Sequence, residues 1–136
     1  MLPSITGYVI ALVTFVAIDL IWLGIMAPRF YKPALGDIGL ASVNLPSAVV
    51  FYLLYPLGLV IFAVDPALRS GSAGTALLYG ALFGFFTYAT YDLTNQATLR
   101  NWTSSLSAVD IAWGTVLGAA SSLVAFVAVV WIFSNS

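Results

Sequence analysis

Residues 87–102 read TYATYDLTNQATLRNW and close an apolar segment that begins near Thr75. Inside what should be a membrane helix, this stretch carries Asp92 and Asn95. An ionisable side chain at that depth costs about 3 kcal/mol on insertion scales. We therefore expect the rest of the chain to supply polar partners for Asp92, so that the stretch becomes the centre of an intramembrane polar site.

The composition is typical of a membrane protein. Of the 136 residues, 62% are hydrophobic and only 7% are charged, whereas a soluble domain has about 25% charged residues. A net charge of −1 excludes the basic surface of a nucleic-acid-binding protein. Cysteine and histidine are absent, which excludes disulfides, the usual zinc sites and His-ligated haem. Glutamate is absent too, so the acidic residues are five aspartates: Asp19, Asp37, Asp65, Asp92 and Asp110.

Four segments are long enough to cross a bilayer, whose hydrocarbon core of about 30 Å needs roughly 20 helical residues. The predicted spans are residues 4–27, 46–64, 75–99 and 106–133. The prediction is an all-α membrane protein in which four transmembrane helices form an up-down antiparallel bundle. The whole chain, residues 1–136, is expected to be a single transmembrane domain.

Proline residues suggest where two of these spans end. Pro28 should end the first span, so that residues 28–45 form the longest connection, which can include a short interfacial helix. Pro56 should kink the second span, and Asp65 with Pro66 should close it. A signal peptide is the competing interpretation of the first span, but it lacks a basic leading region and its apolar run is too long.

The basic residues predict an orientation. Arg29, Lys32 and Arg100 fall in the connections after the first and third spans, whereas Arg69 falls alone on the other side. Lysine and arginine are enriched in short cytoplasmic loops. The distribution favours an inner-membrane protein with these two connections in the cytoplasm and both termini outside.

Three acidic residues should lie at one depth. Asp19 and Asp92 precede the ends of their spans by about eight residues, and Asp110 follows the start of its span by about five. At a rise of about 1.5 Å per residue, all three lie roughly 8–12 Å below the same membrane face. Tyr52 and Tyr55 fall at a similar depth. Since successive spans alternate in direction, all these side chains should meet in one leaflet.

Small residues predict how the third and fourth spans pack. Residues four apart share a helix face, and small ones there let two helix backbones approach closely. The row on the third span is Ala76, Gly80, Gly84, Tyr88, Asp92 and Gln96. The row on the fourth span is Asp110, Gly114, Gly118 and Ser122. Docking of these rows would bring Asp92 close to Asp110.

The first and fourth spans share an Asp-x-x-Trp pattern. Asp19 precedes Trp22, and Asp110 precedes Trp113, by three residues, so each pair lies on one helix face. An inverted repeat of the transporter type is not indicated, because one aspartate comes late in its span and the other early. The pattern suggests a carboxylate beside an indole N–H donor. Placement of both tryptophans in the aromatic belt of the membrane interface is the alternative.

Four motifs resemble a bacterial domain-of-unknown-function family of small, predicted four-helix inner-membrane proteins. They are DLIW from Asp19 to Trp22, FYLLY from Phe51 to Tyr55, YDLTN from Tyr91 to Asn95 with ATL at 97–99, and DIAWG from Asp110 to Gly114. The resemblance covers essentially the whole chain. It implies an inner-membrane protein without an assigned activity, and it also implies a lipid-linked role.

These observations predict an intramembrane carboxylate cavity that binds or modifies a lipid or isoprenoid-like ligand. The predicted ligand-binding residues are Asp19, Trp22, Tyr52, Tyr55, Tyr88, Asp92, Asn95, Asp110 and Trp113, and no catalytic residue is assigned. The acids must share protons or hold a cation; no cofactor is expected, although oxygen ligands would suit a divalent cation such as Mg²⁺ or Ca²⁺. One alternative is a proton- or cation-coupled transporter acting as a homodimer. Another is an accessory subunit of a larger membrane complex, in which the acids only hold helices together.

Overall fold

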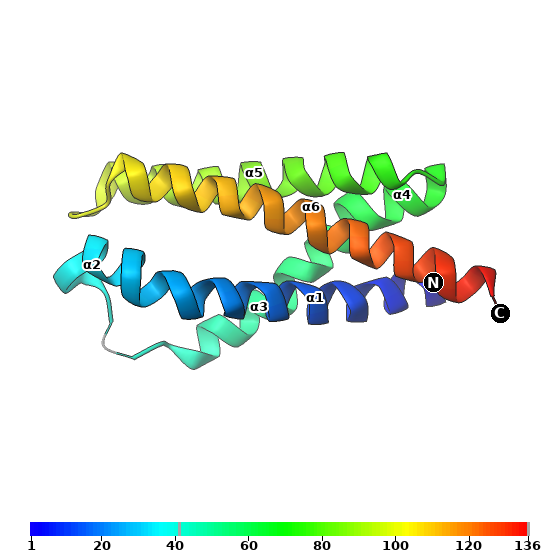
Figure 1. Cartoon of the computed structure of the whole chain (residues 1–136), viewed down its shortest axis with the longest axis horizontal. Coiled ribbons are helices and arrows are strands. Elements are labelled where there is room, and N and C mark those ends of the chain that lie inside the picture. The colour runs from blue at the N-terminus through cyan, green and yellow to red at the C-terminus, as the bar shows by residue number, and fades with distance from the viewer. Residues whose placement is uncertain (41, 136) are drawn as a thin grey trace.

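The computed structural model describes residues 1–40 and 42–135, which are helical apart from short connections (Figure 1). The helices form four rods. The first consists of α1 (Leu2–Met26), the π turn η1 (Ala27–Tyr31), α2 (Lys32–Leu35) and the 3₁₀ turn η2 (Gly36–Ile38). The second consists of α3 (Leu45–Leu59), the π turn η3 (Val60–Val64) and α4 (Asp65–Ser70). The third and fourth rods are single helices, α5 (Ala73–Thr98) and α6 (Ser104–Ser134).

Three of these rods meet the requirements of a membrane span. Within the described residues, Leu2–Ile38, Leu45–Ser70 and Ser104–Ser134 are long and apolar enough to cross a bilayer. Helix α5 has 26 residues and is therefore long enough, but the polar residues of its second half make it less apolar. The chain is thus an all-α protein with several apolar helices, and the fourth membrane span remains a prediction.

The expected ends of the first two rods were wrong. Pro28 lies at the start of η1, and the first rod continues to Ile38, so most of the expected connection at residues 28–45 is helical. Asp65 and Pro66 begin α4 instead of closing the second rod. The backbone stays in the right-handed helical region at Met26 and at Val64, so each proline continues its rod, and a wider π turn lies at or directly before it. Pro56, which was expected to kink the second span, lies inside α3, and the π turn η3, a feature often found at kinks, begins four residues later.

Helices α5 and α6 pack through the predicted rows of small residues. The buried residues of α5 are Ala76, Gly80, Gly84 and Asp92. A Cβ added at Gly80 would meet the carbonyl oxygen of Gly118, and one added at Gly84 would meet that of Gly114. The two backbones are therefore in direct contact, which confirms the predicted docking.

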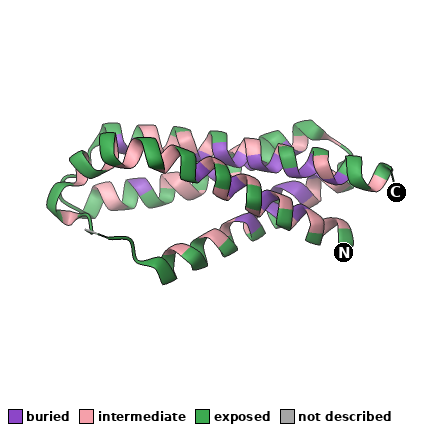
Figure 2. Cartoon of the chain, turned by 60° about the horizontal axis from the view of Figure 1, so that its bottom comes forward, coloured by how far each residue is buried: buried purple, intermediate pink, exposed green. Residues whose placement is uncertain are grey.

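The remaining core joins α1, the second rod and α6. Phe15, Leu59 and Leu117 form one fully buried cluster. Figure 2 shows the buried residues, in purple, gathered between the rods, with exposed residues on the outside. The outer face is itself apolar and includes Leu53, Leu54 and Leu57. Such a large exposed apolar surface is unusual for a soluble monomer and suits a lipid environment.

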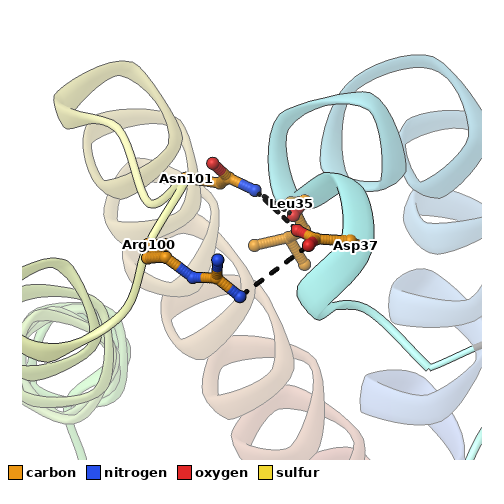
Figure 3. A network of polar contacts seen from close by, with 4 residues as sticks. All are labelled: Leu35, Asp37, Arg100 and Asn101. Atoms are coloured by element: carbon orange, nitrogen blue, oxygen red, sulfur yellow. Dashed lines mark hydrogen bonds and ion pairs between the residues drawn. The ribbon is translucent and has the colours of Figure 1, made fainter.

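One end of the molecule is closed by a polar contact between the first rod and the α5–α6 turn (Figure 3). The Asn101 side-chain Nδ2 donates to the Leu35 carbonyl oxygen at 2.9 Å and to the Asp37 carboxylate at 3.2 Å. Arg100 forms an ion pair with the same carboxylate at 3.7 Å. Asn101 has a φ of +68°, a conformation that asparagine tolerates better than most residues.

We expect the hydrogen bonds at this end to matter more than the ion pair. Asn101→Ala removes two donors and places alanine at a positive φ, which should lower the free energy of unfolding by about 1–2 kcal/mol. Arg100→Gln removes an ion pair between highly exposed side chains, so its cost should stay below about 1 kcal/mol. Unfolding of the purified variants in detergent, followed by circular dichroism, measures both. A greater loss for Arg100→Gln would contradict this ranking.

Candidate functional site

A cavity of about 610 Å³ lies between α1, α3, α5 and α6. This volume is in the range of sites for small organic ligands. Most of the lining side chains are aromatic or aliphatic, and two are carboxylates. The lining residues are Asp19, Trp22, Leu23, Ser47, Ala48, Phe51, Tyr55, Thr87, Tyr88, Tyr91, Asp110 and Trp113.

Asp19 is held by two neutral donors from other helices. The Tyr52 hydroxyl donates to its Oδ2 at 2.6 Å, and the Trp113 Nε1 donates to its Oδ1 at 3.0 Å. The side chain is 6% exposed. Both oxygens therefore accept a hydrogen bond in a buried position, which satisfies the carboxyl group without any basic partner and fixes its orientation towards the cavity.

Asp110 is held through a relay. The Tyr31 hydroxyl donates to Asp110 Oδ1 at 2.9 Å, and the Trp22 Nε1 donates to that hydroxyl at 3.0 Å. Tyr31 belongs to η1, the π turn that follows α1. A π turn holds more residues than an α turn, so it changes the face on which the following residues lie. The turn thus contributes to the site a side chain from beyond the predicted end of the first span.

The two Asp-x-x-Trp patterns meet in a reciprocal arrangement. The rings of Trp22 and Trp113 are stacked, with centroids 4.2 Å apart and planes inclined by 4°. Each indole is linked by hydrogen bonds to the aspartate of the other helix. Trp113 donates directly to Asp19, whereas Trp22 donates to Tyr31, which in turn donates to Asp110. The predicted pairing of each indole with the carboxylate of its own helix was therefore wrong. The rings stack across the α1–α6 interface, so the Trp113 N–H meets Asp19 of α1, whereas the Trp22 N–H meets Tyr31 of its own rod.

Asp92 lies behind the cavity wall. Its side chain is fully buried, and its carboxyl group interacts closely with that of Asp110, although the contact falls short of the geometry of a hydrogen bond. Its electrostatic partner is Asp110, so the two carboxyl groups are neighbours. The Ser107 hydroxyl donates to the backbone carbonyl of Asp92 and to the side chain of Gln96, not to the carboxyl group. Asp92 thus adds a buried acidic group directly next to the cavity, paired with a second acid instead of a base.

The structure brings most of the predicted site residues together. Six of the nine line the cavity: Asp19, Trp22, Tyr55, Tyr88, Asp110 and Trp113. Tyr52 and Asp92 do not line the cavity, but each contacts a carboxyl group that does: Tyr52 donates to Asp19, and Asp92 neighbours Asp110. Asn95 does not line the cavity; it is half-buried and interacts with Tyr91. The hydroxyl of Tyr55 bonds Thr87 and not a carboxylate, while the Tyr88 ring covers Gly114.

Sequence reasoning missed several residues of the site, above all Tyr31. The expected end of the first span at Pro28 put Tyr31 in a connection, outside the bundle. The available signal was the Phe30–Tyr31 aromatic pair directly after the first span. Phe51 was noticed only as part of a motif, and Tyr91 was not among the predicted ligand-binding residues, although both line the cavity. Among the residues that the structure describes, no three acidic side chains are grouped as a metal site would require.

The helices and the buried polar site together define a membrane protein of the multi-helix class. Residues 4–127 match a family model described as a predicted membrane protein, DUF2177. The match covers most of the chain, so the chain belongs to this family of membrane proteins of unknown function, as the sequence motifs predicted. Comparisons with curated proteins and with solved structures found no significant match.

Proposed function

We propose that this chain is a four-span protein of the bacterial inner membrane that binds an amphipathic, lipid- or isoprenoid-like molecule. The observation that carries the proposal is the cavity of about 610 Å³, which has aromatic and aliphatic walls and two carboxylates. Apolar walls suit a hydrocarbon tail, whereas Asp19 and Asp110 suit a polar end. No buried basic side chain neutralises these acids, because all four lysine and arginine residues of the chain are exposed.

The proposed topology is an up-down antiparallel bundle with α5 as the third span. In Figure 1 the two termini lie at one end, and α2 and the α5–α6 turn lie at the other. The ion pair of Arg100 with Asp37 supports this grouping, since it joins the end of the first rod to the connection that follows the third. Arg29 and Lys32 lie in the same part of the first rod as Asp37, after the end of α1. Three of the four basic residues thus gather at one end, which favours that end for the cytoplasm.

The rim of the cavity supports entry from the bilayer. Ser47, Ala48 and Phe51 lie along one side of α3 and line the cavity. Phe51 and Ser47 are also exposed on the outside of the molecule. An amphipathic molecule can therefore reach the aromatic walls sideways from lipid, while its polar end approaches Asp19 and Asp110.

Filling the cavity should remove the bound ligand. Ala48→Trp places an indole in the cavity, whereas Val49→Trp, one residue further on, points the same side chain outwards from a position that is 54% exposed. We expect mass spectrometry of the purified wild-type protein to detect a co-purifying amphipathic molecule at near-stoichiometric level. Ala48→Trp should reduce the amount of bound molecule by about tenfold, since a loss of only about 1.4 kcal/mol of binding free energy has this effect. Val49→Trp should leave the amount unchanged.

Other outcomes of this experiment would contradict the proposal. Equal retention in both variants would show that the molecule is bulk lipid on the outer surface. If no molecule co-purifies and none competes for the site, the ligand-binding function fails. Proton flux in proteoliposomes that Asp92→Asn abolishes would favour the homodimeric transporter instead, and co-migration with a large assembly would favour the accessory subunit.

A further inference from the structure

We infer that the polar end of the ligand is a cation, an ammonium or quaternary ammonium group held by Asp19 and Asp110 against the aromatic rings of the cavity. The inference rests on the proposed function, because it specifies the chemistry of the ligand that this cavity binds. It concerns the ligand class and not one compound; a free amine and a lipid head group share this chemistry.

The charges of the cavity support a cationic ligand. Two carboxylates line it, and Asp92 stands directly behind Asp110. None of the lining residues is basic. Asp92 is fully buried, and its carboxyl group faces another acid, Asp110, instead of a base. Neighbouring buried acids must share protons or hold a cation, and a bound cation would supply the positive charge that no side chain of the cavity provides.

The rings of the cavity distinguish an organic cation from a metal ion. Trp22, Trp113, Tyr55, Tyr88, Tyr91 and Phe51 provide six aromatic side chains around the two carboxylates. Aromatic faces attract cations, and cages of such rings recognise quaternary ammonium groups. A hard divalent cation would need six or more oxygen ligands, whereas both Asp19 oxygens are engaged with Tyr52 and Trp113. A quaternary ammonium group, whose positive charge is diffuse, binds against ring faces without such coordination.

The test compares probes that differ only in their head group. Decyltrimethylammonium, decyl sulfate and decanol share one tail and carry a positive, negative and neutral head. Each is titrated into the full-length protein in nanodiscs while tryptophan fluorescence is recorded, since the stacked Trp22 and Trp113 line the cavity. We expect decyltrimethylammonium to bind at least about tenfold more tightly than either other probe.

Matched variants locate the effect. Asp19→Asn and Asp110→Asn should each weaken decyltrimethylammonium binding by about tenfold or more, and the double variant should weaken it further. Asp65→Asn makes the same change at a carboxylate that bonds Ser4 away from the cavity, and it should leave the affinity unchanged. Retained binding of decanol shows that the Asp19 and Asp110 variants are still folded.

The outcomes separate this inference from the proposed function. If decanol or decyl sulfate binds as tightly as the cation and Ala48→Trp blocks it, the cavity binds amphipathic molecules but the cationic head group is wrong. If Asp65→Asn weakens binding as much as Asp19→Asn, the effect is general surface charge and the inference also fails. If no probe binds, both the cation inference and the proposed function fail.

Discussion

Gly84→Ala should lower the free energy of unfolding by about 3 kcal/mol, the upper part of the usual range for overpacking. The added Cβ would meet the carbonyl group of Gly114 and the Cα of Thr115 on α6. These are backbone atoms of a neighbouring helix, so no side chain can turn aside to make room. The helices must separate, and the close backbone contact between α5 and α6 is then lost.

A matched glycine separates this contact from a general glycine effect. Gly24 lies inside α1, and a Cβ added there meets nothing within 4 Å. Gly24→Ala should therefore change the free energy of unfolding by less than about 1 kcal/mol, with the sign of a stabilisation, because alanine favours helix. Unfolding of both variants in detergent, followed by circular dichroism, makes the comparison. Equal stability of the two variants would show that α5 and α6 do not touch at Gly84.

Trp113→Leu should lower the free energy of unfolding by about 2–3 kcal/mol and abolish the electronic coupling of two indole rings. The substitution removes the stacking on Trp22 and the hydrogen bond to Asp19 Oδ1. A buried acceptor that loses its donor costs about 1–3 kcal/mol, and lost ring contacts add about 0.5–1.5 kcal/mol. Near-ultraviolet circular dichroism reports the coupled rings, and thermal unfolding reports the stability.

The control uses the same change at an exposed tryptophan. Trp131 is 67% exposed near the end of α6, so Trp131→Leu should alter the free energy of unfolding by less than about 0.5 kcal/mol and keep the coupled signal. The prediction fails if Trp113→Leu preserves that signal, because the rings would then not be stacked. It also fails if Trp131→Leu costs as much stability as Trp113→Leu.

The approach of Asp92 to Asp110 could be predicted because it depends on local rules. Glycines four apart lie on one helix face, and in each of the two helices this face continues to an aspartate. The depth argument likewise needed only the order of the helices and the rise of 1.5 Å per residue. Both arguments use distances along one helix, which residue spacing determines directly. The convergence of Asp19 and Asp110 at the cavity follows the same logic.

The ends of the rods could not be predicted in this way. Pro28 and Pro66 were interpreted as stops, yet each lies in the first turn of a helical segment that continues a rod. A proline ends a helix only where its ring clashes with the preceding turn or removes a needed N–H bond. Pro28 lies in the π turn η1, and Pro66 lies in the first turn of α4, directly after the π turn η3. Residue types alone do not reveal which α turn will be replaced by a π turn.

The membrane class, the family, the helical rows and the set of acids that need partners could all be derived from residue types and their spacing. Each of these depends on composition or on spacing within one helix. Three contacts could be seen only once the helices were placed against one another: Trp113 with Asp19, Tyr31 with Asp110, and Asp92 with a second acid. These contacts depend on the stagger and rotation of one helix against another, which side-chain packing across the interface sets and no single-helix pattern encodes.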